Sequence, residues 1–198
     1  MPKIADHSDR MRAIASAAIG VIGEAGLDNT RLRDVARAAD VTTGAVTHYF
    51  DGKDAVLEAA LAEVVRRLIE AQRSARVVDG DVAGAVAAFM PNTEERRRDW
   101  KVWFAFWGRA ISDARLRRQH RAYYAAILAN LTDSIRAFQR SGLAHPAADP
   151  ALLADAVVAA VDGLGIRASL EPDEWPPERQ RKTLRAMLEP ILRAPPPI

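Results

Sequence analysis

Apolar residues recur along this chain every three or four positions, which is the period of an amphipathic α-helix. The first such helix ends before Gly26, and glycine commonly follows the last turn of a helix. Its apolar face consists of Ile14, Ala17, Ala18, Val21, Ile22 and Ala25. No segment alternates apolar and polar residues as a half-buried β-strand does. The pattern therefore predicts an all-α protein.

Turn and capping signals divide the rest of the chain into eight further helices, which makes nine in all. Asp149 and Pro150 combine an N-cap with a proline at the first helical position. Pro190 lacks a backbone N–H and should kink or fray the last helix, and Pro195–Ile198 is expected to be a loose tail. The predicted helices cover residues 32–39, 43–48, 52–76, 81–90, 94–112, 113–142, 150–170 and 176–192.

Residues 30–53 carry the clearest functional signal, because two short helices in this stretch are joined by a tight turn. The second of these helices buries Val46 and is about six residues long. Its outward side chains are short, namely those of Thr43, Ala45, Thr47 and His48. A thin helix with short polar side chains fits the major groove of DNA. The segment therefore predicts a helix-turn-helix.

A family resemblance rests on the run VTTGAVTHYFDGKDAVLEAAL at residues 41–61, which resembles the recognition helix and following helix of TetR-family transcriptional repressors. The shared features are Thr42, Gly44, Val46, Tyr49, Phe50, Lys53 and Leu57. Together with THYF, the later run WKVWFAFWGRA at 100–110 is most similar to the choline-sensing BetI-type branch. Two positions depart from the family pattern: Asp40 replaces a turn glycine, and Thr47 stands where many members carry tyrosine.

The resemblance implies a two-domain organisation and a regulatory function. It implies a helix-turn-helix DNA-binding domain at 1–53 and a helical ligand-binding and dimerisation domain at 54–198, with a linker helix at about 53–76. Such a protein is a ligand-responsive transcriptional regulator. Repression is the usual direction in the family, with a homodimer on a palindromic operator that a small-molecule inducer releases. The residues themselves do not distinguish repression from activation.

Candidate DNA contacts combine the resemblance with the exposed pattern. Thr30, Tyr49 and Lys53 resemble phosphate contacts of the family, and Arg31 adds a positive charge. The candidates for base edges or nearby sugar-phosphate are Thr42, Thr43, Thr47 and His48, while Gly44 permits a close approach. Purely structural roles remain open, since Thr42 caps a helix and both Tyr49 and His48 can pack locally. Residues 1–53 hold seven basic and seven acidic residues, so affinity depends on local placement rather than on net charge.

Four aromatic residues on one helical face predict an effector site. Their positions are i, i+3, i+4 and i+7, occupied by Trp100, Trp103, Phe104 and Trp107. Core packing explains many aromatic stripes, but three tryptophans in eight residues are bulkier than packing needs, and buried indole N–H groups require partners. Tryptophan faces attract cations, so a choline-like cation is the first ligand hypothesis, with an apolar or aromatic metabolite as the alternative. Further lining candidates are Tyr123, Tyr124, Phe89 and Met90, whereas Asp162 is expected at a solvated or interface position.

A homodimer interface is predicted from the two last helices. Residues 150–170 carry an apolar arc and an adjoining arc of smaller side chains, which together need two neighbouring helices. Burial inside a monomer is the alternative. The predicted interface residues are Ala154, Val158, Val161, Gly165, Leu184 and Leu188.

Composition narrows the remaining possibilities. The chain has 198 residues, no cysteine and no apolar run near the ~18 residues of a membrane span, so we expect a cytoplasmic protein without disulfides or thiolate metal sites. Its four histidines are scattered without a metal-ligand or catalytic spacing, so we predict no metal, no cofactor and no enzymatic activity. A helical protein- or membrane-interaction module remains the alternative function, ahead of an all-α enzyme.

Overall fold

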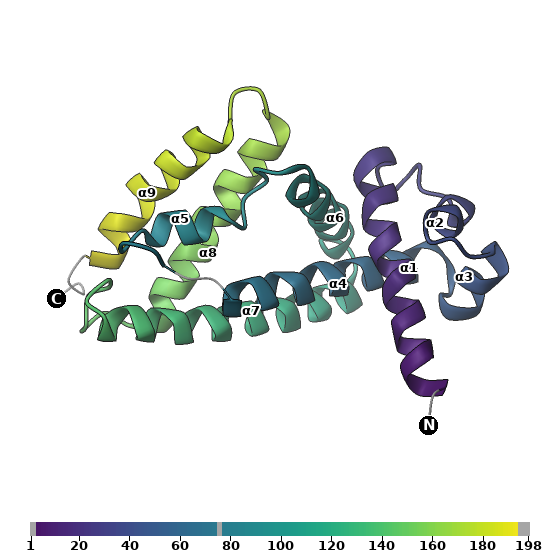
Figure 1. The fold of residues 1–198 in the computed structure, drawn as a ribbon, viewed down its shortest axis with the longest axis horizontal. Coiled ribbons are helices and arrows are strands. Elements are labelled where there is room, and N and C mark those ends of the chain that lie inside the picture. Colours follow the sequence, from purple (N-terminus) through teal and green to yellow (C-terminus); the bar gives the residue numbers. More distant parts are fainter. Residues whose placement is uncertain (1–2, 75–76, 194–198) are drawn as a thin grey trace. The chain divides into compact units, whose positions relative to one another are not determined.

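The computed structural model describes residues 3–74 and 77–193, and these residues form helices and loops without a β-strand (Figure 1). The all-α prediction is confirmed, as is the number of nine helices within the described residues. The helices are α1 (Lys3–Ala25), α2 (Leu32–Ala38), α3 (Thr43–Tyr49), α4 (Gly52–Ser74), α5 (Val82–Ala87), α6 (Glu94–Ala110), α7 (Ala114–Arg140), α8 (Pro150–Leu170) and α9 (Pro177–Arg193).

Local backbone chemistry explains most of the helix boundaries. Gly26 ends α1 at φ +74°, and Asp40 occupies the α2–α3 turn at φ 55° in place of the usual glycine. Asp can adopt this left-handed conformation more easily than most residues. Asp149 caps α8 by accepting from the N–H of Ala151. The predicted helix at 81–90 is shorter than expected, because regular helix ends at Ala87.

Two other expectations concern chain ends and proline. The predicted end of α4 at residue 76 and the tail at 195–198 lie outside the described residues. Pro190 does not end α9, which continues to Arg193. The carbonyl four residues earlier belongs to Ala186, which is exposed, so water can replace the hydrogen bond that Pro190 cannot donate.

The chain divides into two compact units, each described here by itself. The first unit comprises residues up to Arg67 and Arg97–Gln119, and the second comprises Leu68–Arg96 and the chain from His120 onward. The first unit therefore contains α1–α3, most of α4, most of α6 and the start of α7. The predicted boundary at residue 53 between a DNA-binding and a ligand-binding domain stays a prediction, since these units describe packing rather than function.

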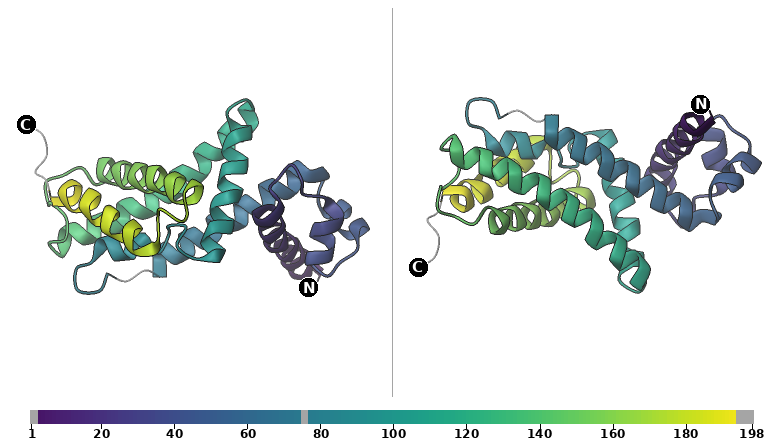
Figure 2. Two further views of the ribbon diagram at one scale, coloured as in Figure 1. Left: turned by 90° about the horizontal axis from the view of Figure 1, so that it is seen from above. Right: turned by 90° about the horizontal axis from the view of Figure 1, so that it is seen from below.

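Apolar side chains form the core of the helix-turn-helix in the first unit. Ile14 and Ile22 of α1, Val35 of α2 and Val46 of α3 are each at most 1% exposed. Helix α2 packs against both α1 and α3, and the ribbons of the three helices lie grouped together in purple and dark blue (Figure 1 and Figure 2). The recognition helix therefore has one buried face and one open face.

Polar contacts connect α6 to α1 within the same unit. Lys101 Nζ of α6 donates to the carbonyl oxygen of Gly23 in α1 at 2.6 Å, and Arg98 lies 3.5 Å from Glu24. A Cβ atom on Gly23 would lie 2.7 Å from Cγ of Arg98, which is closer than real Cβ atoms come to other atoms. Glycine at position 23 thus permits the close crossing of α6 over α1.

Further ion pairs connect α4 to α6 and to the start of α7. Arg109 of α6 pairs with Asp54 of α4, and Arg115 of α7 makes two hydrogen bonds of 2.6 and 2.7 Å to Glu58. Because all these residues belong to the first unit, α6 is part of the same packed body as the helix-turn-helix.

The second unit is built around an apolar core from α5, α7, α8 and α9. Met90, Ile135, Ala154 and Leu184 are fully buried in it. Helix α9 packs against both α5 and α8 (Figure 1). At the α8–α9 turn, the ring of Trp175 lies between two guanidinium groups, with Arg167 at 4.6 Å and Arg179 at 4.3 Å from the ring centroid. None of the described helices is long and apolar enough to cross a membrane.

Candidate nucleic-acid interface and effector site

Helix α3 presents a row of small polar side chains on its open face. Thr42 is the N-cap, and its hydroxyl oxygen accepts from the N–H of Ala45 at 3.1 Å. Val46 is 0% exposed and anchors the helix, while Thr43, Thr47 and His48 are exposed. The predicted burial of Val46 and exposure of Thr43, Thr47 and His48 are confirmed, whereas Ala45, also predicted to face outward, is half-buried. Thr42 therefore caps α3 in the protein without DNA. Its hydroxyl oxygen keeps a second lone pair, and the side chain can stay in the cap position when DNA binds.

The hydroxyl of Thr47 is held loosely and can change partners. It donates to the backbone carbonyls of Thr43 at 3.2 Å and Gly44 at 3.1 Å. Both bonds lie on an exposed helix surface, where exchange for another acceptor costs little. Thr47 is thus available for a base edge or a phosphate oxygen.

Tyr49 is half-buried between two imidazole rings. The ring of His48 lies 5.2 Å and that of His7 of α1 lies 4.8 Å from the Tyr49 ring, both edge-on. These contacts fix the orientation of Tyr49 at the end of α3. They also place two histidines beside the predicted phosphate contact.

Gly44 has no structural reason to be glycine in this fold. Its φ is not positive, and a Cβ atom there would have a single neighbour within 4 Å, the Oγ1 of Thr42 at 3.8 Å. Glycine within a helix costs about 0.5–1 kcal/mol relative to alanine. The missing side chain therefore destabilises the free protein and leaves space on the exposed face of α3.

Two predicted phosphate contacts have other partners in the structure. Thr30 is 1% exposed and its hydroxyl donates to the carbonyl of Gly26 at 2.8 Å, so it stabilises the α1–α2 loop and does not reach the surface. Lys53 Nζ donates to the carbonyls of Leu27 and Asp28 at 2.9 and 2.8 Å. Lys53 keeps one N–H for a phosphate, whereas Thr30 has no free donor. Arg31 is exposed at the start of α2.

The aromatic residues of α6 form one contiguous cluster in the first unit. Trp107 is central, with ring centroids 5.7 Å from Phe104, 5.8 Å from Trp103 and 6.3 Å from Trp100. At these separations the rings contact one another directly, so a cation has no room between them. Trp100 and Trp103 are buried, while Phe104 and Trp107 are half-buried. A ligand would therefore lie against an outer face of the cluster.

Trp107 also carries an unused hydrogen-bond donor. Its Nε1 is buried and has no acceptor among the described residues. An indole N–H normally finds a partner when it is buried, because leaving it unpaired costs free energy. The cluster thus combines an aromatic surface with a donor that an oxygen atom of a ligand would satisfy.

The other ligand candidates lie in the second unit. Met90 is 0% exposed and belongs to its apolar core, and Phe89, Tyr123 and Tyr124 are half-buried. Tyr124 Oη donates to Asp162 Oδ2 of α8 at 2.8 Å. Asp162 is half-buried and bonded within the chain, so it is not in a solvated position, while an interface position stays a prediction. Helical periodicity does not predict this bond, since the two residues are 38 positions apart.

The predicted interface residues are mostly internal to the chain. Ala154, Leu184 and Leu188 are at most 1% exposed and Gly165 is buried, so these four pack within their own protomer. Val158 and Val161 are half-buried. The exposed large apolar residues of the same helices are instead Leu152 (60%), Ile166 (39%), Leu170 (73%) and Met187 (37%). Helical periodicity over residues 176–192 places Met187 beside the apolar face of Leu184 and Leu188 and so predicts its burial, but Met187 is exposed. The apolar surface available to a partner is rotated away from the predicted one.

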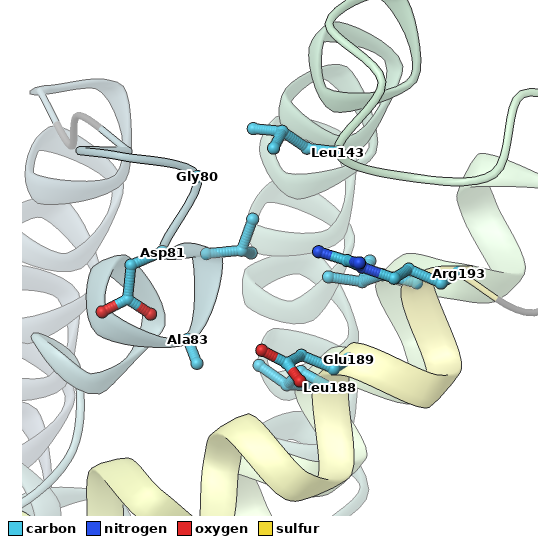
Figure 3. Close-up of a pocket in the computed structure, with 9 residues that line it drawn as sticks. Gly80, Asp81, Ala83, Leu143, Leu188, Glu189 and Arg193 are labelled. Carbon is cyan, nitrogen blue, oxygen red and sulfur yellow. The ribbon is translucent and has the colours of Figure 1, made fainter.

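A small cavity between α5 and α9 does not qualify as an effector site. Figure 3 shows that Asp81, Glu189 and Arg193 surround it, with Leu143 and Leu188 nearby. Its volume of about 20 Å³ holds roughly one water molecule. Within residues 3–74 and 77–193, no three histidine, aspartate or glutamate side chains come together as metal ligands.

Comparisons with known proteins agree with this geometry. Residues 14–60 match the family model described as bacterial regulatory proteins, tetR family, and residues 80–193 match that of the C-terminal part of BetI-type transcriptional repressors. The chain is 33% identical over 175 residues to the HTH-type transcriptional regulator BetI of Burkholderia ambifaria, a match that covers 86% of this chain and 87% of that protein.

Solved structures share the fold over nearly the full length. A transcriptional regulator from a Rhodococcus species is 28% identical, with a TM-score of 0.77, and the match covers 92% of this chain and 95% of that one. A transcriptional regulator from Saccharomonospora viridis, solved in complex with choline, is 22% identical with a TM-score of 0.76 and coverages of 92% and 96%.

Proposed function

We propose, from the premise that this chain belongs to the TetR family of bacterial regulatory proteins, that it is a homodimeric repressor released from its operator by a small molecule. The family consists of helix-turn-helix transcriptional regulators and not of enzymes. DNA binding and transcriptional regulation follow from that membership. The contacts, the effector and the dimer surface below are our proposals, as is a cytoplasmic location.

Gly44 is the observation that carries the proposed DNA contact. The fold has open space where its side chain would be, so the destabilising glycine is best explained by a close approach of DNA to α3. The exposed hydroxyl and imidazole groups of Thr43, Thr47 and His48 flank it. We assign Thr47 and His48 to base edges, and Thr42, Tyr49, Arg31 and Lys53 to the sugar-phosphate backbone.

Selection of genomic fragments by the purified protein tests this assignment. We expect one palindromic sequence to be enriched, with half-sites about one DNA turn apart. Substitution of Thr47 or His48 should change the preferred sequence, whereas Lys53→Ala should weaken binding to all sequences alike. Recovery of no sequence above random competitor DNA would contradict the proposed function.

The proposed effector binds on the outer face of the α6 aromatic cluster. Phe104 and Trp107 offer half-buried rings, and the unpaired N–H of Trp107 calls for an oxygen acceptor. A choline-like cation has both a cationic head for an aromatic face and a hydroxyl oxygen. The choline complex of the Saccharomonospora viridis regulator supports the same class, and an apolar or aromatic metabolite is the alternative.

Effector release is tested by titrating choline into the operator complex while tryptophan fluorescence is recorded. We expect quenching or a spectral shift that parallels loss of the mobility shift. The variant Trp107→Phe keeps an aromatic ring but removes the N–H, and it should weaken the response. Unchanged fluorescence and operator affinity with choline would exclude this cation as the effector.

The proposed coupling runs through α6 itself. Lys101 and Arg109 connect this helix to α1 and α4, so a ligand that displaces α6 would move the helix-turn-helix with it. The two helix-turn-helix segments of the homodimer must fit their half-sites of the operator at the same time. A small displacement of either segment therefore lowers operator affinity. The ligand can shift the equilibrium between the two conformations only by the difference between its binding free energies for them.

The proposed homodimer uses the exposed apolar surface of α8 and α9. Leu152, Ile166 and Leu170 lie on one face of α8, and Gly163 on that face has no atom within 4 Å of where its Cβ would be. Helices from two copies would bury this surface in a four-helix interface. We expect light scattering to give a dimer mass at micromolar concentration, and the double substitution Leu152→Arg with Ile166→Arg to give a monomer.

A further inference from the structure

Three aromatic rings of the first unit meet between α1 and the end of α3. The Tyr49 ring lies edge-on to the imidazole of His7 in α1, with ring centroids 4.8 Å apart and ring planes at 70°. The imidazole of His48, which belongs to α3 itself, lies 5.2 Å from the Tyr49 ring at 71°. Edge-to-face contacts at such separations are favourable for aromatic rings. The ring of Tyr49 is therefore held from two helices.

The hydroxyl group of Tyr49 is free to bind an external acceptor. Among residues 3–74 and 77–193 it has no hydrogen-bond partner, and its oxygen is not one of the buried atoms without a partner. The oxygen therefore reaches solvent while the residue as a whole is half-buried. A tyrosine with a packed ring and an accessible O–H suits a hydrogen bond to a DNA phosphate.

The backbone at Tyr49 is fixed by its neighbours, so only the side-chain torsions remain to be set. Val46 is 0% exposed and Phe50 is 5% exposed, and the N–H of Phe50 donates to the carbonyl of Val46 at 2.9 Å. These two residues anchor the last turn of α3 on the apolar core. The ring contacts of Tyr49 then decide the direction in which its hydroxyl points.

His7 provides the ring contact that can persist in an operator complex. His48 is exposed, and its proposed contact with a base edge would take its imidazole away from Tyr49. His7 has no hydrogen bond or ion pair within the described part of the chain, so no other polar partner competes with its contact to Tyr49. Ordering a side chain at an interface costs free energy on binding, and a side chain that is already held avoids that cost.

We infer that His7 is a positioning residue of the operator interface, which holds the Tyr49 ring so that its hydroxyl points at a DNA phosphate. The first turns of α1 thereby contribute to DNA binding, although His7 itself does not touch the duplex. One ring contact at an exposed position contributes little to stability, so His7 acts on operator affinity and not on folding. The role of His7 rests on the proposed function and on the proposed phosphate contact of Tyr49.

A double-mutant cycle tests this role, with the full-length protein and the DNA fragment that the wild type selects. Tyr49→Phe removes the hydroxyl and should weaken binding about tenfold, since a hydrogen bond to a charged phosphate is lost. His7→Ala should weaken binding about two- to tenfold, the range expected for ordering one side chain. Because His7 acts through Tyr49, the double variant should lose no more than Tyr49→Phe alone. Losses that multiply would mean two independent DNA contacts and would overturn the positioning role.

A conservative variant and a neighbouring control separate positioning from direct contact and from folding. His7→Phe keeps an aromatic edge without an N–H donor, so it should bind within about twofold of the wild type. Its failure to restore binding would show that the imidazole itself contacts DNA and would contradict positioning. Ser8→Ala, at the next and likewise exposed position of α1, should bind as the wild type does. Calorimetric melting of His7→Ala should match the wild type, and unfolding large enough to explain its weaker binding would also overturn the role of His7.

The wild type and the variants report on different proposals. A wild type that selects no operator contradicts the proposed function before any variant is made. A wild type that selects an operator, with His7→Ala binding that operator equally well, refutes the role of His7 and leaves the regulator intact. Equal binding by Tyr49→Phe would remove the phosphate contact of Tyr49, and the role of His7 would fall with it.

Discussion

Both compact units of this protein have an apolar core, but in the first unit helix α6 is also joined to its neighbours by several polar contacts. In the first unit, polar contacts such as Lys101 to the Gly23 carbonyl and Arg115 to Glu58 connect α6 and its neighbours to α1 and α4. In the second unit, α5, α7, α8 and α9 share one apolar core around Leu184 and Ile135. Ion pairs at a surface can exchange partners at little cost, whereas a close-packed core resists displacement. We therefore expect α6 to shift against its neighbours in the first unit more easily than the helices of the second unit shift against one another.

The largest effect is expected from opening the core of the second unit. Leu184 is 0% exposed, so Leu184→Ala should lower the free energy of unfolding by about 2–5 kcal/mol through lost burial and a residual cavity. Calorimetric melting measures this loss. Met187→Ala on the same helix is the control, since Met187 is 37% exposed and should lose much less. Similar losses for both variants would contradict the apolar core as the source of stability.

The next effect concerns the most buried ion network of the first unit. Glu63 is 6% exposed and bonds to Arg66 at 2.6 Å and to Arg67 at 3.1 Å, so Glu63→Gln should cost about 1–3 kcal/mol at neutral pH. The hydrogen bond from Arg66 holds the pKa of Glu63 below its usual value. A carboxyl with a lowered folded pKa contributes its stability above the unfolded pKa and loses it as the pH falls through the folded pKa.

Melting curves of wild type and Glu63→Gln from neutral to acidic pH measure that dependence. The difference between the two proteins should be largest at neutral pH and should shrink below about pH 4. Exposed Glu178→Gln serves as the control and should show a small difference throughout. A difference in melting temperature between wild type and Glu63→Gln that grows as the pH falls would contradict this prediction.

A smaller effect of opposite sign is expected on the open face of α3. Gly44→Ala should stabilise the free protein by about 0.5–1 kcal/mol, because the space for a Cβ is open, yet weaken operator binding. Thermal melting and a mobility-shift titration measure the two quantities. Gly108→Ala in α6 is a matched control with open space at its Cβ, and it should stabilise the protein without altering operator affinity. An unchanged operator affinity of Gly44→Ala would contradict a close approach of DNA to α3 at Gly44.

The smallest expected effect on stability comes from one exposed ion pair of the first unit. Asp54→Asn removes the partner of Arg109 and should cost about 0.2–1 kcal/mol at low salt, and less at high salt. Effector titration of the operator complex should nevertheless reveal weaker release, since this pair connects α6 to α4. A variant with lower stability but wild-type release would show that the pair does not transmit the effector signal.

The sequence predicted the features that depend on local chemistry. Helical periodicity placed Val46 in the core and Thr47 on the surface, and the N-cap role of Thr42 follows from its position before α3. The left-handed conformation of Asp40 was likewise predictable, because the turn allows few residue types. These outcomes depend on residues a few positions apart.

Features that depend on distant residues were not predictable. One local feature was missed as well: Thr30 was expected at a phosphate, but its hydroxyl donates to the carbonyl of Gly26, only four residues earlier. The bond from Tyr124 to Asp162 joins two helices, and a periodic pattern gives the face of each helix but not which faces meet. The exposed face of α8 differs from the predicted interface for the same reason, because α8 is apolar around much of its circumference.

The crossing of α6 over α1 at Gly23 gives a way to impose the proposed displacement without a ligand. One added methyl group at this position would meet the first carbons of the Arg98 side chain, which cannot swing aside as the end of that side chain can. Gly23→Ala should therefore act as a wedge that pushes the two helices apart while every effector and operator residue stays as it is. Under the proposed coupling, such a protein should bind its operator weakly even without an effector, because the added carbon atom imposes the displacement that a ligand would cause.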